Sequence, residues 1–474
     1  RTPRRTSSAR SSATSATRAV RSACRDACRS CGCRSAARRP SSPGGAGPAA
    51  GRLPVLALVV RGPGFWTAIE RTMSFATYTG KSQIIEKHND DVVICGAYRS
   101  PLTRARKGGL AQCTPEEMLG NVLKGLIAKT GVDPKLIEDV SVGNVLPPGG
   151  GATGARQAAL WAGIPNTAAV NTVNRQCSSG LASVTQIANE IITGQIDLGI
   201  GAGTESMTLN YGAGVMPVKM SDEIMSNEEA ADCMLPMGIT SENVAKKYNV
   251  TREKQDAFAA ESYKRAAAAK AAGKFKDEII PIKYIDDDGN ERYIAEDDGI
   301  RQGVTKESLS KLKPAFEKDG CTHAGNASQV TDGAAAVLLA RRSVAQKLGL
   351  PIVGKFAGAV VVGVPPNLMG IGPAFAIPKL FEKAHITKDD VDIYEINEAF
   401  ASQALFSVEH VGLPLAKVNP VGGAIAMGHP LGATGSRQIA TALAEAKRTG
   451  AKLIVTSMCI GTGMGMASLI VNEQ

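Results

Sequence analysis

Three residues of this chain stand among small residues and glycines in segments suited to thiol chemistry: Cys177, His429 and Cys459. Cys177 lies in VNRQCSSGLASV, just before apolar residues at helical spacing, so we expect it to precede or open a helix. The unpaired N–H groups and positive dipole end of a helix start favour a thiolate, and small neighbours leave room for a bulky group on the sulfur. The alternative is a buried structural cysteine.

His429 is one of five histidines and lies in GGAIAMGHPLGATGSRQ, with glycine before it and proline after it. A histidine held in such a rigid loop is a candidate base for a thiol. Cys459 lies in SMCIGTGMG, at the end of an apolar strand where glycines let backbone approach a ligand closely. Asn397, in EINEAF, is expected at a strand–helix junction, where capping the helix is its alternative role.

The elements that carry these residues predict an α/β fold. Residues 90–97 form an apolar, β-branched run typical of a buried strand, and residues 114–130 have apolar side chains at helical spacing. Strand and helix signals then alternate, which indicates a mostly parallel sheet covered by helices. Residues 177–203 and 433–459 share one pattern: a small-residue turn, an amphipathic helix, a glycine and an apolar strand. We therefore expect two halves built from a duplicated unit.

The middle of the chain, from about residue 219 to about residue 319, is more charged and predicts an inserted loop domain. An alanine-rich helix is expected after Thr251, ending near Gly273. The Asp288–Gly289 pair predicts a hairpin.

Residues 1–72 differ from the rest of the chain. They hold fourteen Arg and two acids, a net of +12, so the other 402 residues carry −2 of the total +10. This segment is expected to be a disordered basic tail or a presequence, with the mature protein starting near Met73. It also contains four cysteines that could hold zinc, although they lack the two-pair spacing of structural sites: Cys24, Cys28, Cys31 and Cys33.

Composition argues against several classes of protein. A nearly neutral body with 4% aromatic residues does not indicate a nucleic-acid partner. The longest apolar run near the start, Leu53–Val60, is too short to span a membrane. Ten scattered cysteines are typical of a reduced intracellular protein. The spacing Gly149, Gly151, Gly154 matches a dinucleotide fingerprint but lacks the acid about twenty residues on, so we interpret it as chance.

Five separated segments, in this order, resemble the thiolase family: NRQCSSG, GITSEN, NEAFA, GGAIAMGHPLGATG and CIGTGMG. The resemblance runs from about Asp90 to the C-terminus. It is closest to the peroxisomal type of 3-ketoacyl-CoA thiolase (acetyl-CoA C-acyltransferase), because LPMGITSENVA, LKPAFEKDG and VGVPPNLMGIGPA are also similar.

The resemblance implies two similar α/β halves stacked as a five-layer αβαβα core, in a homodimer. We expect the N-terminal half over residues 73–345, including a loop domain at about 208–325, and the C-terminal half over residues 346–474. Coenzyme A is implied as a co-substrate, with no tightly bound cofactor and no metal.

Residue by residue, the resemblance implies that Cys177 is the acylated nucleophile, His429 its base and Cys459 a second acid and base. Asn397 and His429 would position the water of one oxyanion hole. The backbone of Cys177 and Gly461 would form the other.

Ser328 falls where the family contacts the pantetheine of CoA. The neighbouring CTHAGN segment departs from the family, because Cys321 and His323 stand where threonines are common.

The implied reaction is thiolysis of 3-ketoacyl-CoA in fatty acid β-oxidation. The alternatives are a biosynthetic thiolase that forms acetoacetyl-CoA and a non-catalytic acyl-CoA-binding protein. The resemblance implies a peroxisomal address with an import receptor as partner, and a mitochondrial address is the alternative. Arg52–Leu53 begins a peroxisomal signal, but Val59 and Val60 occupy its final positions.

Overall fold

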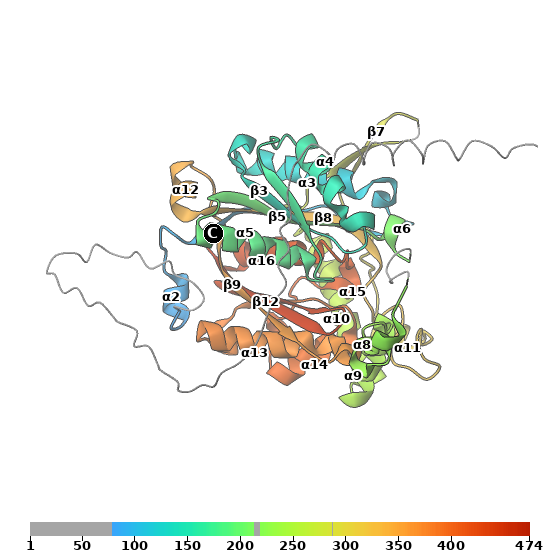
Figure 1. Ribbon diagram of the computed structural model, residues 1–474. Coiled ribbons are helices and arrows are strands. Elements are labelled where there is room, and N and C mark those ends of the chain that lie inside the picture. The colour runs from blue at the N-terminus through green and yellow to red at the C-terminus, as the bar shows by residue number, and fades with distance from the viewer. Residues whose placement is uncertain (1–77, 213–218, 287) are drawn as a thin grey trace, which may run out of the picture. The chain divides into compact units, whose positions relative to one another are not determined.

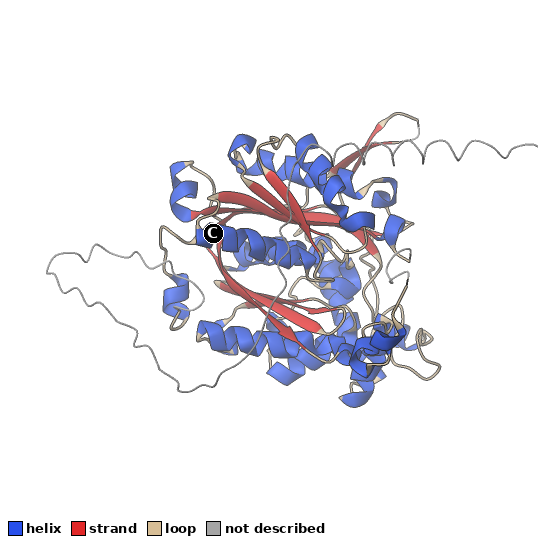
Figure 2. Cartoon of the chain, in the orientation of Figure 1, coloured by secondary structure: helices blue, strands red, loops and turns tan. Residues whose placement is uncertain are grey.

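The computed structural model describes residues 78–212, 219–286 and 288–474. The predictions on residues 1–72 therefore lie outside the described residues: the disordered tail or presequence, the start near Met73, and the zinc site of the four cysteines. Within the described ranges, strands and helices alternate as predicted (Figures 1 and 2).

The main sheet has ten strands in the order β10-β11-β12-β9-β1-β8-β5-β3-β4, with β2 paired to β8. The strands form two groups, β10-β11-β12-β9 in the C-terminal part and β1-β8-β5-β3-β4 in the N-terminal part, which meet where β1 pairs with β9 through Val93 with Lys355 and Ile94 with Gly354. The strands are β1 (Val92–Arg99), β2 (Thr103–Arg104), β3 (Asp139–Gly143), β4 (Ala169–Val173), β5 (Leu198–Ser206), β8 (Thr331–Arg341), β9 (Gly354–Gly363), β10 (Ile393–Ile396), β11 (Leu453–Ile460) and β12 (Met464–Asn472).

The prediction of a mostly parallel sheet is wrong. Strand β3 is parallel to β4 and β5, and β10 is parallel to β11, but the other pairings of this sheet are antiparallel. The reason is visible between β11 and β12, which are joined by only residues 461–463. Such a short turn can reverse the chain but cannot make the long crossover that parallel strands need.

The helices form three layers around the two groups of strands (Figure 2). Helices α5 (Ser179–Thr193) and α16 (Thr434–Thr449) lie between the groups. Helices α3 (Pro115–Thr130) and α4 (Ala152–Trp161) cover the outer face of the first group, and α13 (Gly372–Ala384) and α14 (Ala401–Val411) cover that of the second. The five-layer αβαβα prediction is confirmed.

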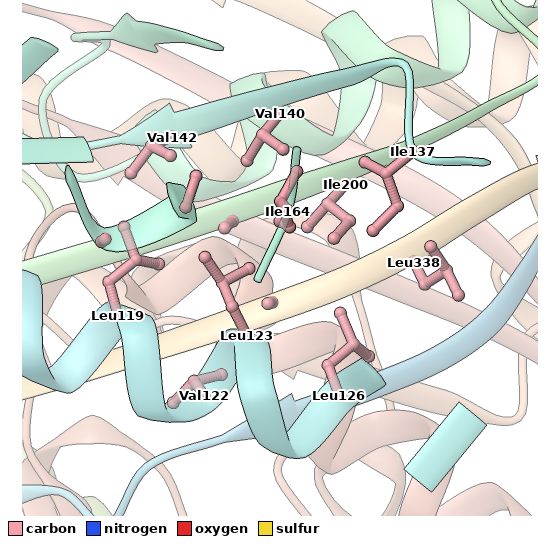
Figure 3. Packing of buried hydrophobic residues seen from close by; sticks show 14 of the residues in the cluster. Leu119, Val122, Leu123, Leu126, Ile137, Val140, Val142, Ile164, Ile200 and Leu338 are labelled. Atoms are coloured by element: carbon pink, nitrogen blue, oxygen red, sulfur yellow. The ribbon is translucent and has the colours of Figure 1, made fainter. Parts of the chain in front are cut away.

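Helix α3, in the outer layer of the N-terminal part, forms where the sequence pattern predicts a helix. Helix α3 begins after Thr114, which forms a capping box with Glu117. Its apolar face packs on the strands, as Figure 3 shows for Leu119, Leu123 and Leu126 against Ile200 and Leu338. Burial of this stripe stabilises both helix and sheet.

The duplicated pattern predicted for residues 177–203 and 433–459 is confirmed as α5 followed by β5 and α16 followed by β11. The two helices touch through glycines near their N-terminal ends. A Cβ on Gly180 would lie 2.7 Å from the carbonyl oxygen of Gly432, and a Cβ on Gly435 would lie 2.2 Å from the nitrogen of Leu181. Only glycine permits this approach, which brings the two helix starts together.

The loop segment between β5 and β8 contains the predicted helix after Thr251, which is α10 (Arg252–Ala271), and the predicted hairpin, which is β6 (Ile282–Ile285) with β7 (Glu291–Ile294). The remaining α-helices are α2 (Lys81–Ile85), α6 (Met207–Asn210), α7 (Asp222–Met225), α8 (Glu228–Asp232), α9 (Met237–Lys247), α11 (Lys306–Ser310), α12 (Arg342–Lys347) and α15 (Ala424–Met427). The 3-10 turns are η1 (Gly109–Gln112), η2 (Pro134–Leu136), η3 (Pro148–Gly151), η4 (Pro366–Ile371), η5 (Lys388–Asp390) and η6 (Leu415–Lys417).

The described residues all belong to one compact unit, so the expected boundaries at residues 345 and 346 and around the loop domain stay predictions. Among the described residues, no helix has both the length and the apolar character needed to cross a bilayer.

Candidate active site

Cys177 lies in the turn that precedes α5, with 9% of its surface exposed. The backbone N–H of Gly461, from the turn after β11, donates to its thiol. Burial raises the pKa of Cys177 to about 11, although this N–H and the residue's own N–H act in the opposite direction. The backbone N–H of Cys177 thus favours the thiolate, in the predicted direction, but burial outweighs it and the resting thiol is neutral.

His429 lies in the loop between α15 and α16, and only 4% of its surface is exposed. Its Nδ1 is 2.6 Å from the hydroxyl oxygen of Thr434. That hydroxyl has one proton, which it donates to the carbonyl of Pro430 at 2.9 Å. The Nδ1 atom must therefore carry a proton and donate to Thr434, which leaves Nε2 as the basic nitrogen.

Asn397 follows β10 directly, and its Nδ2 donates to His429 Nε2 at 3.3 Å. Its Oδ1 atom is buried and has no partner among the described residues. Burial, followed by the positive charge of Arg437, lowers the pKa of His429 to about 3. The imidazole is thus neutral at physiological pH and can accept a proton. The alternative role of Asn397 as a helix cap is not what the structure shows, since α14 begins at Ala401.

Cys459 lies near the end of β11 and is fully buried. Burial raises the pKa of its thiol well above the usual range, and the charge of Cys177 adds to this shift. The two cysteines therefore lie near enough for ionisation of one to oppose ionisation of the other. Asn397 is tied to the same strand, because its backbone N–H donates to the carbonyl of Ser457 at 2.8 Å.

The structure brings the predicted residues to one region but does not join all of them directly. Cys177, Cys459 and Gly461 form one group, and His429 with Asn397 forms a second. Within the described residues, no hydrogen bond links Cys177 to His429. The two lie at the starts of α5 and α16, which contact each other through their glycines.

Ser328 lies beside this region, because its backbone N–H donates to the carbonyl of Ala399 at 2.9 Å. In the CTHAGN segment, which departs from the family pattern, His323 has a structural role. His323 is fully buried, accepts the Gly325 N–H on Nδ1 at 3.0 Å, and donates from Nε2 to Asp256 at 2.7 Å. It joins the segment before Ser328 to α10 and has no free nitrogen for a ligand.

Three buried polar residues at the site were not predicted from the sequence: Glu205, Thr434 and Gln403. Glu205, on β5, accepts the N–H groups of Val145, Leu146 and Gly432, and burial raises its pKa to about 7. A carboxylate in the otherwise apolar run LGIGAGTES was a signal for it. Thr434 and Gln403 gave no such signal, because threonine and glutamine are common on helices.

No group of three or more His, Cys, Asp or Glu side chains that could hold a metal is present in the described part of the chain. The groups that the structure gathers at the site are two thiols, one neutral imidazole, one amide and the N–H groups around Cys177.

Two domain models of one family match this chain: the N-terminal domain of thiolase over residues 92–343 and the C-terminal domain over residues 350–472. The chain belongs to the thiolase family, and it is an acyltransferase.

Among its relatives is the peroxisomal 3-ketoacyl-CoA thiolase of Yarrowia lipolytica, 59% identical over 398 residues, or 83% of this chain and 96% of the relative. The human peroxisomal 3-ketoacyl-CoA thiolase is 52% identical over 80% of this chain and 90% of its own length. The dimeric peroxisomal thiolase of Saccharomyces cerevisiae is 51% identical, with a TM-score of 0.79 over 83% of this chain and all of that chain.

Proposed function

We propose that this chain is a peroxisomal 3-ketoacyl-CoA thiolase of fatty acid β-oxidation. It uses CoA to cleave a 3-ketoacyl-CoA into acetyl-CoA and an acyl-CoA shortened by two carbons. The observation that carries the proposal is the pair of buried cysteines, Cys177 and Cys459, at one site in a chain 59% identical to a relative of that name.

In the first half-reaction, Cys177 attacks the 3-keto carbon. Its raised pKa means that the resting thiol is neutral, so its proton leaves as the sulfur–carbon bond forms. His429 Nε2 is the acceptor of that proton, since Nδ1 is occupied by Thr434. The alkoxide that develops is stabilised by donors already in place, of which the N–H of Gly461 is one.

Cleavage of the carbon–carbon bond leaves an acyl thioester on Cys177 and an enolate of acetyl-CoA. Cys459 supplies the proton that converts the enolate to acetyl-CoA. It then removes the thiol proton of the incoming CoA, whose sulfur takes the acyl group from Cys177. Cys177 leaves as a thiolate and recovers the proton held by His429. Asn397 and His429 hold the water of the second oxyanion hole, and Ser328 contacts the pantetheine arm. CoA is a co-substrate, and the steps need no tightly bound cofactor.

Replacing Thr434 with valine is expected to lower kcat/KM for thiolysis by about 10- to 100-fold, the usual cost of losing an outer partner that orients a histidine. Valine keeps the shape but cannot accept the Nδ1 proton, so the tautomer with a basic Nε2 is no longer enforced. Steady-state kinetics measure the effect, and Thr434→Ser should restore most of the activity.

The matched control is Thr441→Val on the same helix, whose hydroxyl donates to Glu278 at 2.9 Å instead of to the site. We expect it to lower the melting temperature with little change in kcat/KM. Equal kinetic losses in the two variants would show that Thr434 only supports packing.

The alternative within the family is an enzyme that joins two acetyl-CoA molecules to form acetoacetyl-CoA. The catalytic groups serve both directions, so acyl chain length decides between the two. We expect higher kcat/KM for a 3-ketoacyl-CoA of about ten to sixteen carbons than for acetoacetyl-CoA, because each buried methylene contributes about 0.8 kcal/mol. Cleavage of acetoacetyl-CoA alone would favour the biosynthetic alternative. A non-catalytic acyl-CoA-binding protein would turn over neither.

The proposed assembly is a homodimer, and the support is that the peroxisomal thiolase of Saccharomyces cerevisiae is dimeric. The proposed address is the peroxisome, with an import receptor as a further partner. The support is that relatives at 51 to 59% identity are named peroxisomal, whereas the human mitochondrial 3-ketoacyl-CoA thiolase is 35% identical, with a TM-score of 0.73.

A further inference from the structure

Cys459 has one polar side-chain partner in the described part of the chain. Its thiol donates to Oε1 of Gln403 at 3.5 Å. The apolar cluster that contains Cys459 supplies the rest of its packing: Ala327, Met369, Ala399 and Phe400, with Met237 against them. A charge on Cys459 acts on Cys177 through space, but Gln403 is the side chain that is hydrogen-bonded to the sulfur.

Gln403 is fully buried, but only one of the two polar atoms of its side-chain amide has a hydrogen-bond partner in the described part of the chain. It is the third residue of α14, and its Oε1 accepts the Cys459 thiol. Its Nε2 is buried and has no partner among the described residues. Buried amide donors without partners are uncommon in folded proteins, and each needs an explanation.

The proposed reaction creates a partner for that donor. When Cys459 protonates the enolate, its S–H bond breaks, a C–H bond forms and the electron pair stays on sulfur. The resulting thiolate lies in an apolar cluster, where an ion without hydrogen bonds is strongly disfavoured. The S–H bond forms again when the thiolate takes the proton of the CoA thiol.

We propose that Gln403 is a positioning residue whose amide follows the protonation state of Cys459. Its Oε1 accepts from the thiol, and after the amide turns over, its Nε2 donates to the thiolate. The turn is easy because the terminal torsion of glutamine is broad and roughly two-fold. No hydrogen bond through Nε2 is lost when it happens. This inference rests on the proposed function, which supplies the thiolate.

The test separates the two half-reactions in the variant Gln403→Met, which keeps a similar volume without the amide. Exchange of deuterium from solvent into the methyl group of acetyl-CoA reports proton transfer at carbon, which is the work of Cys459. Acylation of Cys177 by an activated thioester reports the nucleophile. We expect exchange to slow by about 10- to 100-fold, as for loss of a hydrogen bond to a charged group. Acylation should stay within about twofold of the unaltered protein.

The matched control is Gln255→Met. Gln255 is also fully buried, but it lies on α10 and donates to the carbonyl of Val250 at 2.8 Å. It should leave both rates unchanged. Gln403→Asn is the second variant: it retains a polar amide, so it tests the same point if methionine prevents folding. The asparagine side chain is one methylene shorter than glutamine, so its amide lies farther from the sulfur of Cys459. Gln403→Asn should therefore show the same selective loss of exchange.

Undiminished exchange in the folded Gln403 variants would overturn the inference, and so would equal losses of exchange and acylation. A selective loss of exchange supports it. If the unaltered protein neither exchanges nor acylates, the proposed function itself has failed, and this is seen before any variant is compared.

Discussion

Replacing His429 with alanine is expected to lower kcat/KM for thiolysis by about 10³- to 10⁴-fold, near the upper end for loss of a general base. Burial raises the pKa of Cys177 to about 11. At pH 7 only about one molecule in 10⁴ then carries the thiolate without help. His429 is the neutral base that takes the proton of Cys177 during the attack, so the thiol need not ionise beforehand. Without His429, acylation and turnover should therefore fall together.

The comparison variant is His410→Ala, because His410 is an exposed histidine of α14 that contacts the ring of Phe406. It should retain nearly full activity. Rate profiles against pH add a second check: the activity that remains in His429→Ala should rise steadily with pH as the Cys177 thiol ionises unaided. A mild loss in His429→Ala, with an unchanged pH profile, would contradict the assignment of His429 as the base.

The second large effect is expected for Cys459→Ser, which should lower kcat for thiolysis by about 10²- to 10⁴-fold. Serine is a much weaker proton donor than a thiol, so protonation of the enolate and deprotonation of CoA both suffer. Acylation of Cys177 by an activated donor does not require Cys459. Single-turnover acylation should therefore remain within a few-fold of the unaltered protein.

Equal losses of acylation and turnover in Cys459→Ser would mean that Cys459 supports the nucleophile and does not transfer protons. The contrast with His429→Ala is the informative feature. His429 acts before the acyl-enzyme forms, whereas Cys459 acts when the enolate leaves and when CoA enters.

Sequence alone predicted the family, the layers and the neighbourhoods of the four reactive side chains. Local pattern was sufficient wherever neighbours in the chain decide the structure, as in the capping box of Thr114 and Glu117 at the start of α3. The motifs were also local: Cys177 before α5 and His429 before α16 each lie in a segment with its own recognisable residues.

The features that could not be predicted from the sequence depend on contacts between segments that are distant along the chain. The direction of β8 follows from its pairing with β1 and β5, strands far along the chain. The helix start near Cys177 predicted a thiolate, but the pKa is set by burial among residues from both halves. Likewise, the side chain of Gln403 meets Cys459 across 56 residues of sequence, so no local pattern reveals it.

The role of Cys177 as the acylated nucleophile is tested most directly by locating the acyl group on the enzyme. The purified protein is incubated with acetyl-CoA, digested, and its peptides are mapped by mass spectrometry. We expect one acetyl group per chain, on Cys177, lost again when CoA is added. An acetyl group on Cys113 or Cys233, with Cys177 unmodified, would contradict it.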